Sequence, residues 1–508
     1  MVLPRRRAVR IAVLALISLG LVVGAVSLTD ALNGPVPQGG VTDQAARTTP
    51  EPSASPSTRP GLDVTPVAAP GIGPLGLKWS WAQPATFGFV AGAAGGWAFA
   101  EVEWCDVQPQ PGVYDWSEVD RLVRDSRALG HEPMLKLRTG QCWATEAASG
   151  ATRDPTENVT KATSTPPTDP AAYLSFVRAA VRRYAARGVD DYAIENEPDV
   201  ANFWAASIDD YRSMARRVAA AIHEVDPGAN VMAGGASSTA YGVAMAAAQL
   251  EHDPQRALST YRAYYARRIA GGVSRFPDVA GVAQLRRVLG SEPARRAVDA
   301  VAVTIGLANS GAVDTYQLHY YEAASQLPRV LRFLDARLRD GVPVQAWEVG
   351  VAWPGAGYDE HAQAVETFRI VGLLLAADVR RVVYLPVAYS DAPGKSPVFR
   401  GLTDPTGALL PAGSGWSELA GALAGLHDAP LVPARGRLTG VTWRIGNRQA
   451  ALVWARRATV ALDPDDVSRV ISATGTVVPG VPAVGPEPVL VLGSPNGALT
   501  RNVGSGRY

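Results

Sequence analysis

The amino-acid sequence predicts an α/β fold, a (β/α)₈ TIM barrel with a small C-terminal β-sandwich domain, and three observations support it. Short apolar segments alternate with amphipathic segments between residues 74 and 428, the order typical of a parallel β/α fold. Residues 429–508 change to Thr- and Val-rich alternation interrupted by Gly and Pro. Of the 508 residues, 47% are hydrophobic and only 19% are charged, which provides enough apolar material for a large core.

The N-terminal part predicts an exported chain with a spacer. Four arginines within residues 5–10 precede an uncharged run from Ile11 to Leu28, and a basic flank before an apolar core directs export. This run is short for a spanning helix and long for the core of a signal peptide, so residues 1–32 are a signal anchor, the interpretation we favour, or a cleaved signal peptide. Residues 33–73 are rich in Pro, Ser, Thr and Gly, which predicts a disordered linker. We expect the chain to be anchored to the outer face of the cytoplasmic membrane, or secreted if the segment is cleaved.

Eight short apolar segments are the candidate barrel strands. They lie at residues 75–81, 97–104, 133–138, 191–196, 230–235, 314–320, 344–349 and 381–387. Helical patterns, several with caps or acidic first turns, lie between them, for example at residues 116–129, 170–187, 208–225, 327–339 and 360–377. A doubly wound sheet is the alternative, but no GxGxxG motif follows the first strand.

Two connections between strands are long, residues 141–168 and residues 237–312. Both follow the carboxyl ends of strands, which is the face where barrel proteins bind ligands, so we expect them to form cleft walls. Decorative insertion is the alternative. At the other end of the chain, we expect residues 429–508 to form the small β-sandwich and to finish in a flexible tail.

Charge and histidine content argue against several classes of function. The formal net charge is +1, so no strong positive field is available to neutralise nucleic-acid phosphates. The six histidines are scattered, without HExxH spacing, so we expect neither a metal ion nor another cofactor. No GxSxG motif supports an esterase or protease. We expect a neutral ligand and a monomeric chain.

Cys105 and Cys142 are the two cysteines of the sequence. Each follows a candidate strand, and the two strands are neighbours in the predicted barrel, so a disulfide is within reach in an oxidising compartment. Two separate buried thiols are the alternative.

Two glutamates lie at the ends of candidate strands. Asn196-Glu197-Pro198 closes the fourth strand, and Trp347-Glu348 lies in the seventh. The carboxyl ends of parallel barrel strands meet at one face, so both side chains should reach one cleft. Cleavage of a glycosidic bond requires two carboxyl groups, one to protonate the leaving oxygen and one to attack the sugar or activate water. Two solvated surface acids are the alternative, which the apolar strands preceding them disfavour.

These segments resemble the acid/base and nucleophile signatures of glycoside hydrolase clan A, the retaining (β/α)₈ glycosidases. Residues 104–116 with Asp120 resemble the W…P.PG.YDW…D stretch of family 39 and neighbouring families. Residues 173–204 resemble the run into the Asn-Glu-Pro loop, and residues 317–321 resemble the His-x-Tyr element beside the nucleophile. The resemblance covers roughly residues 75–425.

The resemblance implies an extracytoplasmic retaining glycoside hydrolase that acts on a cell-surface or environmental polysaccharide. It makes Glu197 the general acid/base, with a raised pKa, and Glu348 the ionised nucleophile. It also implies that Asn196 donates a hydrogen bond to the sugar 2-hydroxyl. A transglycosylase that remodels envelope glycan would use the same two carboxyl groups, and a non-catalytic glycan-binding barrel would usually have lost one of them. The expected partners are an oligo- or polysaccharide and, through the N-terminal segment, a membrane.

Further residues are expected to bind the substrate. His319 and Tyr321, or Tyr320 if the register shifts by one residue, would orient the nucleophile or a sugar hydroxyl. Tryptophans that follow strand ends can stack on the apolar faces of sugars, and we expect about half of them to do so rather than to pack in the core. They are Trp79, Trp81, Trp143, Trp204 and Trp353.

One position departs from the clan pattern. Many members carry an arginine three residues before the tryptophan matched by Trp104, and this chain has Glu101 there. Arg138, at the end of the third strand, could supply the missing positive charge to a substrate. Period-two alternation places Lys136 and Arg138 on one strand face, beside Glu101 and Glu103 of the adjacent strand. A salt-bridged pair of strands inside the barrel is the alternative.

Overall fold

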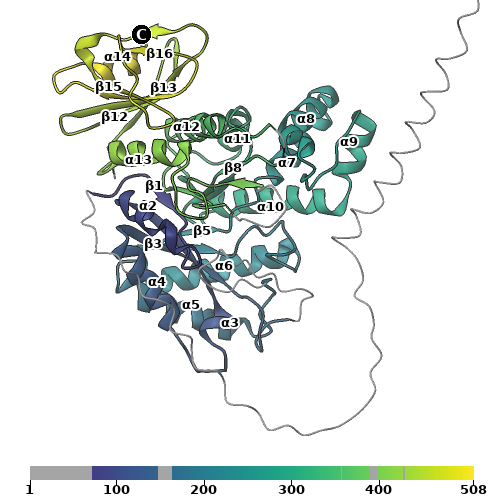
Figure 1. The fold of residues 1–508 in the computed structure, drawn as a ribbon. Coiled ribbons are helices and arrows are strands. Elements are labelled where there is room, and N and C mark those ends of the chain that lie inside the picture. Colours follow the sequence, from purple (N-terminus) through teal and green to yellow (C-terminus); the bar gives the residue numbers. More distant parts are fainter. Residues whose placement is uncertain (1–70, 147–162, 356, 390–397, 427–428) are drawn as a thin grey trace, which may run out of the picture. The chain divides into compact units, whose positions relative to one another are not determined.

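The computed structural model describes residues 71–146, 163–355, 357–389, 398–426 and 429–508 (Figure 1). The predicted signal segment and all but the last three residues of the predicted linker lie outside these ranges. Within the described part of the chain, no helix has both the length and the apolar character needed to cross a membrane.

A nearly closed barrel of parallel strands forms the centre of the described structure (Figure 1). Its eight strands have the order β5-β4-β3-β2-β1-β9-β7-β6, and bridges from Met232 to Thr315 and from Ala236 to Leu318 bring β5 beside β6. All eight predicted strands are confirmed. They are β1 Leu75–Leu77, β2 Gly96–Glu103, β3 His131–Arg138, β4 Asp191–Ile194, β5 Asn230–Ala233, β6 Tyr316–Tyr320, β7 Val344–Val349 and β9 Val382–Tyr384.

Helices alternate with these strands, as a (β/α)₈ fold requires. In chain order they are α2 Phe87–Gly92, α4 Ser117–Ala128, α5 Pro170–Ala185, α6 Ile208–Val225, α10 Glu292–Asn309, α11 Leu327–Asp335, α12 Glu360–Ala376 and α13 Pro411–Leu423. Predicted caps begin two of them. The Asp169 carboxylate accepts hydrogen bonds from backbone N–H groups at the start of α5, and Ser207 accepts one from Asp210 in α6.

The remaining described elements lie mainly in the connections. They are η1 Pro84–Thr86, α3 Trp104–Val107, α7 Ala240–Leu250, α8 Pro254–Ala270, α9 Val282–Leu289, β8 Val351–Ala352, β10 Phe399–Arg400 and η2 Pro464–Asp466. Helices α7, α8 and α9 belong to the long connection between β5 and β6, which is therefore an ordered helical insertion. Strands β8 and β10 pair in antiparallel fashion just beyond the end of β7.

Two apolar layers stabilise the barrel. The interior is filled by a cluster of Trp97, Phe99, Met134, Ala193, Met232, Trp347 and Val383. A larger cluster fills the space between the strands and the surrounding helices. Since apolar side chains occupy the interior, the polar residues that point inwards beyond this layer, towards the carboxyl ends of the strands, can form a site.

The C-terminal region differs from the predicted β-sandwich. Within residues 429–508 the structure has one five-stranded antiparallel sheet, in the order β11-β12-β13-β17-β15, and a two-stranded sheet of β14 and β16. These strands are β11 Leu431–Pro433, β12 Leu438–Ile445, β13 Arg448–Ala455, β14 Val460–Ala461, β15 Val467–Ser472, β16 Ala483–Val484 and β17 Val489–Gly493. Residues of one sheet face, including Val441 and Leu452, join the main cluster beside α12 and α13. Helices cover this face where a second large sheet was expected. Strand alternation shows that one face of a sheet is buried, but not whether a helix or another sheet covers it.

The end of the chain forms helix α14, Leu499–Ser505, so the prediction of a flexible tail is wrong. Leu499 and Val503 lie four residues apart on one helix face, and both are buried against the C-terminal sheet. Asp466 accepts hydrogen bonds from the backbone N–H of Ala498 and the side chain of Asn502. A helix of seven residues with two apolar contacts has too little periodicity to be recognised in the sequence.

His131, the first residue of β3, should make the stability of the fold depend on pH. Its ring is buried, Nε2 donates to the carbonyl of Val90 at 2.9 Å, and burial lowers its pKa from 6.5 to about 4. The unfolded chain therefore binds a proton that the folded chain does not bind between these two values, so stability falls as pH drops through this window. We expect His131→Gln to reduce the loss of unfolding free energy between pH 7 and pH 4.5 by about 2–3 kcal/mol.

Urea unfolding of the wild-type chain and of this variant at both pH values measures the effect. Gln can still donate a hydrogen bond to the Val90 carbonyl but does not titrate. An equal loss of stability in the two proteins would contradict the prediction.

Candidate active site

Two glutamates and a histidine meet at the carboxyl ends of three strands. Glu197 follows β4, His319 lies on β6 and Glu348 lies on β7, and one side-chain oxygen or nitrogen of each lies within 4.8 Å of the others. His319 Nδ1 lies 3.0 Å from Oε1 of Glu197 and 3.5 Å from Oε2 of Glu348. The two carboxyl groups that the sequence singled out therefore face one another across a short gap.

Irregular backbone at the end of β4 directs Asn196 and Glu197 into this site, while Glu195 points towards β3. Glu195 and Glu197 have φ values of 62° and 35°, a conformation that residues other than glycine rarely adopt. A regular strand would turn Asn196 away from its two neighbours. Instead Glu195 accepts a hydrogen bond from Thr139 N, Asn196 contacts Lys136, and Glu197 contacts His319. Backbone strain of this kind is often concentrated at functional sites.

A bulge in β7 directs the side chain of Glu348 into the site. Gln317 pairs with Gln345 and His319 pairs with Glu348, so β7 advances three residues while β6 advances two. Because of the extra residue, Trp347 stacks on Phe99 in the barrel interior and Glu348 also reaches the site.

The carboxylate of Glu348 is held by one donor on β3 and one donor directly after β6. Lys136 Nζ on β3 lies 2.5 Å from Oε1, and the Tyr321 hydroxyl donates to Oε2 at 3.0 Å. The hydroxyl of Tyr320 instead donates to the carbonyl of Ala323, so the structure places Tyr321 beside Glu348. Sequence reasoning noted the inward face of Lys136 but did not assign it to the site. Lys136 lies two residues before Arg138, and this spacing was the one signal in the sequence that its side chain faces the barrel interior.

Glu197 has the electrostatic character of an acid that keeps its proton. Burial raises its pKa, and the negative charges of Glu348 and Asp199 act in the same direction, which together outweigh the contact with His319. His319 Nε2 lies 2.6 Å from Oε1 of Gln317, which is an acceptor, so Nε2 carries a proton. Nδ1, at 3.0 Å from Glu197 Oε1, is then in position to accept a hydrogen bond from the protonated carboxyl group.

Gly235 leaves room for His319. A Cβ atom at residue 235 would lie 2.4 Å from Cδ2 of the His319 ring, closer than any real contact. The glycine after β5 is therefore required by the position of the imidazole between the two glutamates. Sequence reasoning did not identify either Gly235 or Gln317 as a site residue.

Arg138 lies in a buried ion network instead of facing a ligand. Its Nη1 lies 2.7 Å from Glu101 Oε2 and 2.9 Å from Glu103 Oε1, and its Nε lies 3.6 Å from Glu195 Oε2. The side chain has no exposed surface. The three carboxylates raise its pKa against the opposing effect of burial. The structure thus supports the salt-bridged strands and not the prediction that Arg138 contacts the substrate.

The predicted aromatic residues divide into core and surface. Trp79 and Trp204 are buried, and their indole N–H groups donate to Ser126 Oγ and to the Ser207 carbonyl, so the prediction that they stack on sugars is wrong. They follow strand ends, but their rings turn into the helical layer. Trp353 is half-buried and has the guanidinium of Arg267 4.3 Å from its ring centroid. Trp143 is 44% exposed.

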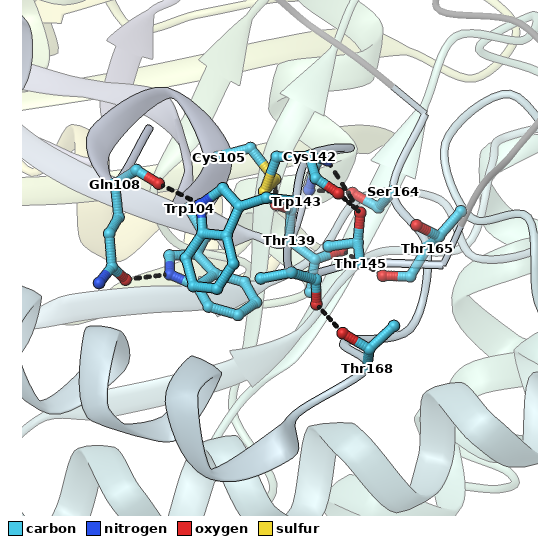
Figure 2. The surroundings of a disulfide bond; sticks show 12 residues. Trp104, Cys105, Gln108, Thr139, Cys142, Trp143, Thr145, Ser164, Thr165 and Thr168 are labelled. Atoms are coloured by element: carbon cyan, nitrogen blue, oxygen red, sulfur yellow. Dashed lines mark hydrogen bonds between the residues drawn. A yellow bond between two sulfur atoms is a disulfide. The ribbon is translucent and has the colours of Figure 1, made fainter. Parts of the chain in front are cut away.

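A disulfide between Cys105 and Cys142 fixes the segment that carries Trp143 (Figure 2). The bond joins α3, directly after β2, to the connection after β3, with Cα atoms 5.4 Å apart, and so realises the first of the two alternatives that the sequence left open. The indole N–H of Trp143 donates to the Gln108 carbonyl at 2.9 Å, and the ring packs edge-on against Trp104. An exposed aromatic face is therefore held rigidly at the carboxyl end of the barrel.

The helical insertion between β5 and β6, together with α10, contacts the loops that follow β4 and β6. Arg275 lies 2.5 Å from Oδ2 of Asp199, and Arg296 donates to the carbonyls of Pro198 and Trp204. Arg268 pairs with Glu322 just after β6. These contacts place the insertion at the carboxyl face of the barrel, where a cleft wall was expected.

The trio of Glu197, His319 and Glu348 also offers three atoms that a metal ion could bind. The Lys136 ammonium, however, already contacts one oxygen of Glu348, and the Tyr321 hydroxyl contacts the other. A second cation at the same carboxylate would be repelled by the first, so the residues present suit acid–base chemistry better than metal binding.

No family model and no curated protein matches the chain. Among solved structures, it is similar to a family 39 glycoside hydrolase from Bacteroides cellulosilyticus, with a TM-score of 0.53 and 15% identity over 84% of this chain and 81% of that one. It is also similar to a GH39 beta-xylosidase from Caulobacter crescentus, with a TM-score of 0.53 and 17% identity over 85% of this chain and 99% of that one. At these identities the similarity establishes the fold alone, a (β/α)₈ barrel.

Proposed function

We propose that this chain is a retaining glycoside hydrolase, with Glu197 as general acid/base and Glu348 as nucleophile. The observation that carries the proposal is the pair of carboxyl groups from β4 and β7, with oxygens within 4.8 Å of one another. Retaining glycosidases separate their two carboxyl groups by about 5–5.5 Å, whereas inverting enzymes need about 6.5–9.5 Å to admit a water molecule. The fold shared with a GH39 beta-xylosidase supports the same reaction class.

The geometry suits a double displacement. Glu348 attacks the anomeric carbon as the glycosidic bond breaks, and the proton of Glu197 passes to the leaving oxygen. Glu197, now ionised, then removes a proton from water, which attacks the anomeric carbon and releases Glu348. The raised pKa of Glu197 supports the first step, and the donors around Glu348 support the ionised state of the nucleophile.

We propose that this reaction takes place outside the cytoplasm, on a cell-surface or environmental polysaccharide. The Cys105–Cys142 disulfide supports an oxidising compartment. The arginines and apolar run at the N-terminus support export and attachment to the outer face of the cytoplasmic membrane.

The test is the stereochemistry of the first product. The full chain, solubilised in mild detergent, is screened against α- and β-linked aryl glycosides and envelope polysaccharides, and the best substrate is followed by proton NMR. We expect the anomeric configuration of the substrate to be retained. Inversion would overturn the mechanism, and activity that is equal in the wild-type chain and Glu348→Ala would overturn the site.

Trp143 is proposed to bind a sugar unit away from the cleaved bond, because it presents a rigid, exposed aromatic face. We expect Trp143→Ala to raise KM for a long oligosaccharide by about tenfold, while kcat/KM for a small aryl glycoside stays near the wild-type value. Trp143→Phe retains an aromatic face and is the matched control. Parallel kinetics on both substrates check this, and equal losses on both would refute the assignment.

A further inference from the structure

Lys136 is a buried cation to which the two-carboxylate mechanism assigns no role. It lies on β3, its side chain has no exposed surface, and strand pairing places it beside Glu101 on β2. Burial removes the hydration of an ammonium group, so such a group persists only where hydrogen-bond acceptors replace water.

The acceptors around Lys136 match the three N–H groups of an ammonium ion. Its Nζ lies 2.5 Å from Oε1 of Glu348 and 2.7 Å from Oδ1 of Asn196. It also lies 4.3 Å from the centroid of the Phe99 ring. Two oxygens and one ring face therefore hold the charged group in a single position.

This contact also determines how the amide of Asn196 is turned. Lysine only donates hydrogen bonds, so the amide must direct its oxygen towards Nζ. The NH₂ group of Asn196 is then the part of the amide that can donate to a sugar hydroxyl. Asn196 is itself buried, between the two glutamates whose positive φ values shape the end of β4.

We propose that Lys136 is a positioning residue, which supplies the counter-charge of the Glu348 carboxylate and fixes the Asn196 amide as a donor to the substrate. The inference rests on the proposed function, since it defines Lys136 relative to the nucleophile. When a bond forms between a Glu348 oxygen and the anomeric carbon, the ammonium stays beside the resulting ester. It then stabilises the carboxylate that leaves as water takes its place.

The first test is the pH dependence of kcat/KM for an aryl glycoside in the full chain. Lys136→Met removes the charge, so Glu348 gains a proton at higher pH, and we expect the acid limb to move up by about one to three pH units. Lys136→Arg keeps the charge and should leave the limb near its wild-type position. An unmoved limb in a folded Lys136→Met variant would overturn the counter-charge.

The second test compares a 2-hydroxy substrate with its 2-deoxy analogue. The wild-type chain should prefer the 2-hydroxy sugar, because the Asn196 amide is held as a donor. In Lys136→Met the amide can turn, and we expect the preference to shrink by about tenfold. A merely structural role for Lys136 would lower activity on both sugars alike and leave their ratio unchanged, which would overturn the amide-fixing role.

A chemical rescue covers the case in which Lys136→Met does not fold. Both natural cysteines are in the disulfide, so Lys136→Cys introduces a single reactive thiol. Alkylation with 2-bromoethylamine rebuilds an amine at the length of lysine, and bromoethane adds a neutral group of similar size. Recovery of the acid limb with the first reagent alone supports the inference, and equal recovery with both overturns it.

A readout without turnover separates this inference from the proposed function. A water-soluble carbodiimide modifies protonated carboxyl groups, and peptide mapping reports its reaction at Glu348 across pH. We expect modification to extend to higher pH in Lys136→Met than in the wild-type chain. That shift in a chain without glycosidase activity would support the counter-charge and overturn the proposed function. Glycosidase activity in the wild-type chain, with no shift of the carbodiimide reaction in Lys136→Met, would overturn the role of Lys136 as counter-charge and leave the proposed function standing.

Discussion

Replacing Glu348 by alanine should lower kcat/KM of the full chain on an aryl glycoside by on the order of 10⁴-fold or more. The side chain is the proposed nucleophile, and it alone is placed by the β7 bulge between the Lys136 ammonium and the Tyr321 hydroxyl. Without it no covalent intermediate forms, and water would have to attack the anomeric carbon directly. The distance between the two carboxyl groups is too short to admit that water molecule, as an inverting enzyme does. Steady-state kinetics with an activated leaving group measure the loss.

Two controls make this result specific. Glu418→Ala removes a glutamate that pairs with Arg469 on the surface of α13 and should leave kcat/KM near the wild-type value. Azide should restore turnover in Glu348→Ala, because a small anion can enter the vacated space and attack the anomeric carbon as the aryl oxygen departs. The product should be a glycosyl azide of inverted configuration. Hydrolysis at the wild-type rate without azide would rule out Glu348 as nucleophile.

Replacing Glu197 by glutamine should lower kcat by about 10²- to 10⁴-fold for a substrate with a poor leaving group. The amide has nearly the shape of the carboxyl group, and its NH₂ can still contact His319, but it supplies no proton to the leaving oxygen. An activated leaving group needs no protonation, so the loss in the first step should be much smaller for a dinitrophenyl glycoside. Comparing the two substrates measures the difference.

The pH profile provides the second readout for Glu197. Burial raises its pKa, so the folded chain keeps the required proton to higher pH than an exposed glutamate would. Activity of the wild-type chain should therefore fall as pH rises through this raised value, which gives the profile an alkaline limb. The limb should disappear in Glu197→Gln. Its persistence would show that another group donates the proton.

The strands were predictable because each is a short apolar run, and the positions of Glu197 and Glu348 near the ends of two such runs placed both at one barrel face. Two cysteines after adjacent strands left a disulfide and two separate thiols as alternatives, and the structure contains the disulfide. These inferences depend on features that are local in the chain or on the general topology of parallel barrels. They required no knowledge of where individual side chains point.

The parts that were missed depend on tertiary packing. Nothing near Trp79 or Trp204 in the sequence shows that these rings turn into the helical layer, whereas Trp143 remains exposed. Lys136 and Arg138 share one alternating face, yet Lys136 reaches Glu348 and Arg138 pairs with acids on β2. Only their neighbours on other strands distinguish their roles.

The extra residue in β7 decides which side chain of that strand becomes the proposed nucleophile. Strict alternation would let either Trp347 or Glu348 face the barrel axis, but not both. This chain places Trp347 in the apolar interior of the barrel and Glu348 in the candidate site beyond it. An alignment of this strand with a seventh strand that lacks the bulge would therefore shift by one residue. It would match Trp347 of the barrel interior to the position that Glu348 occupies in the candidate site.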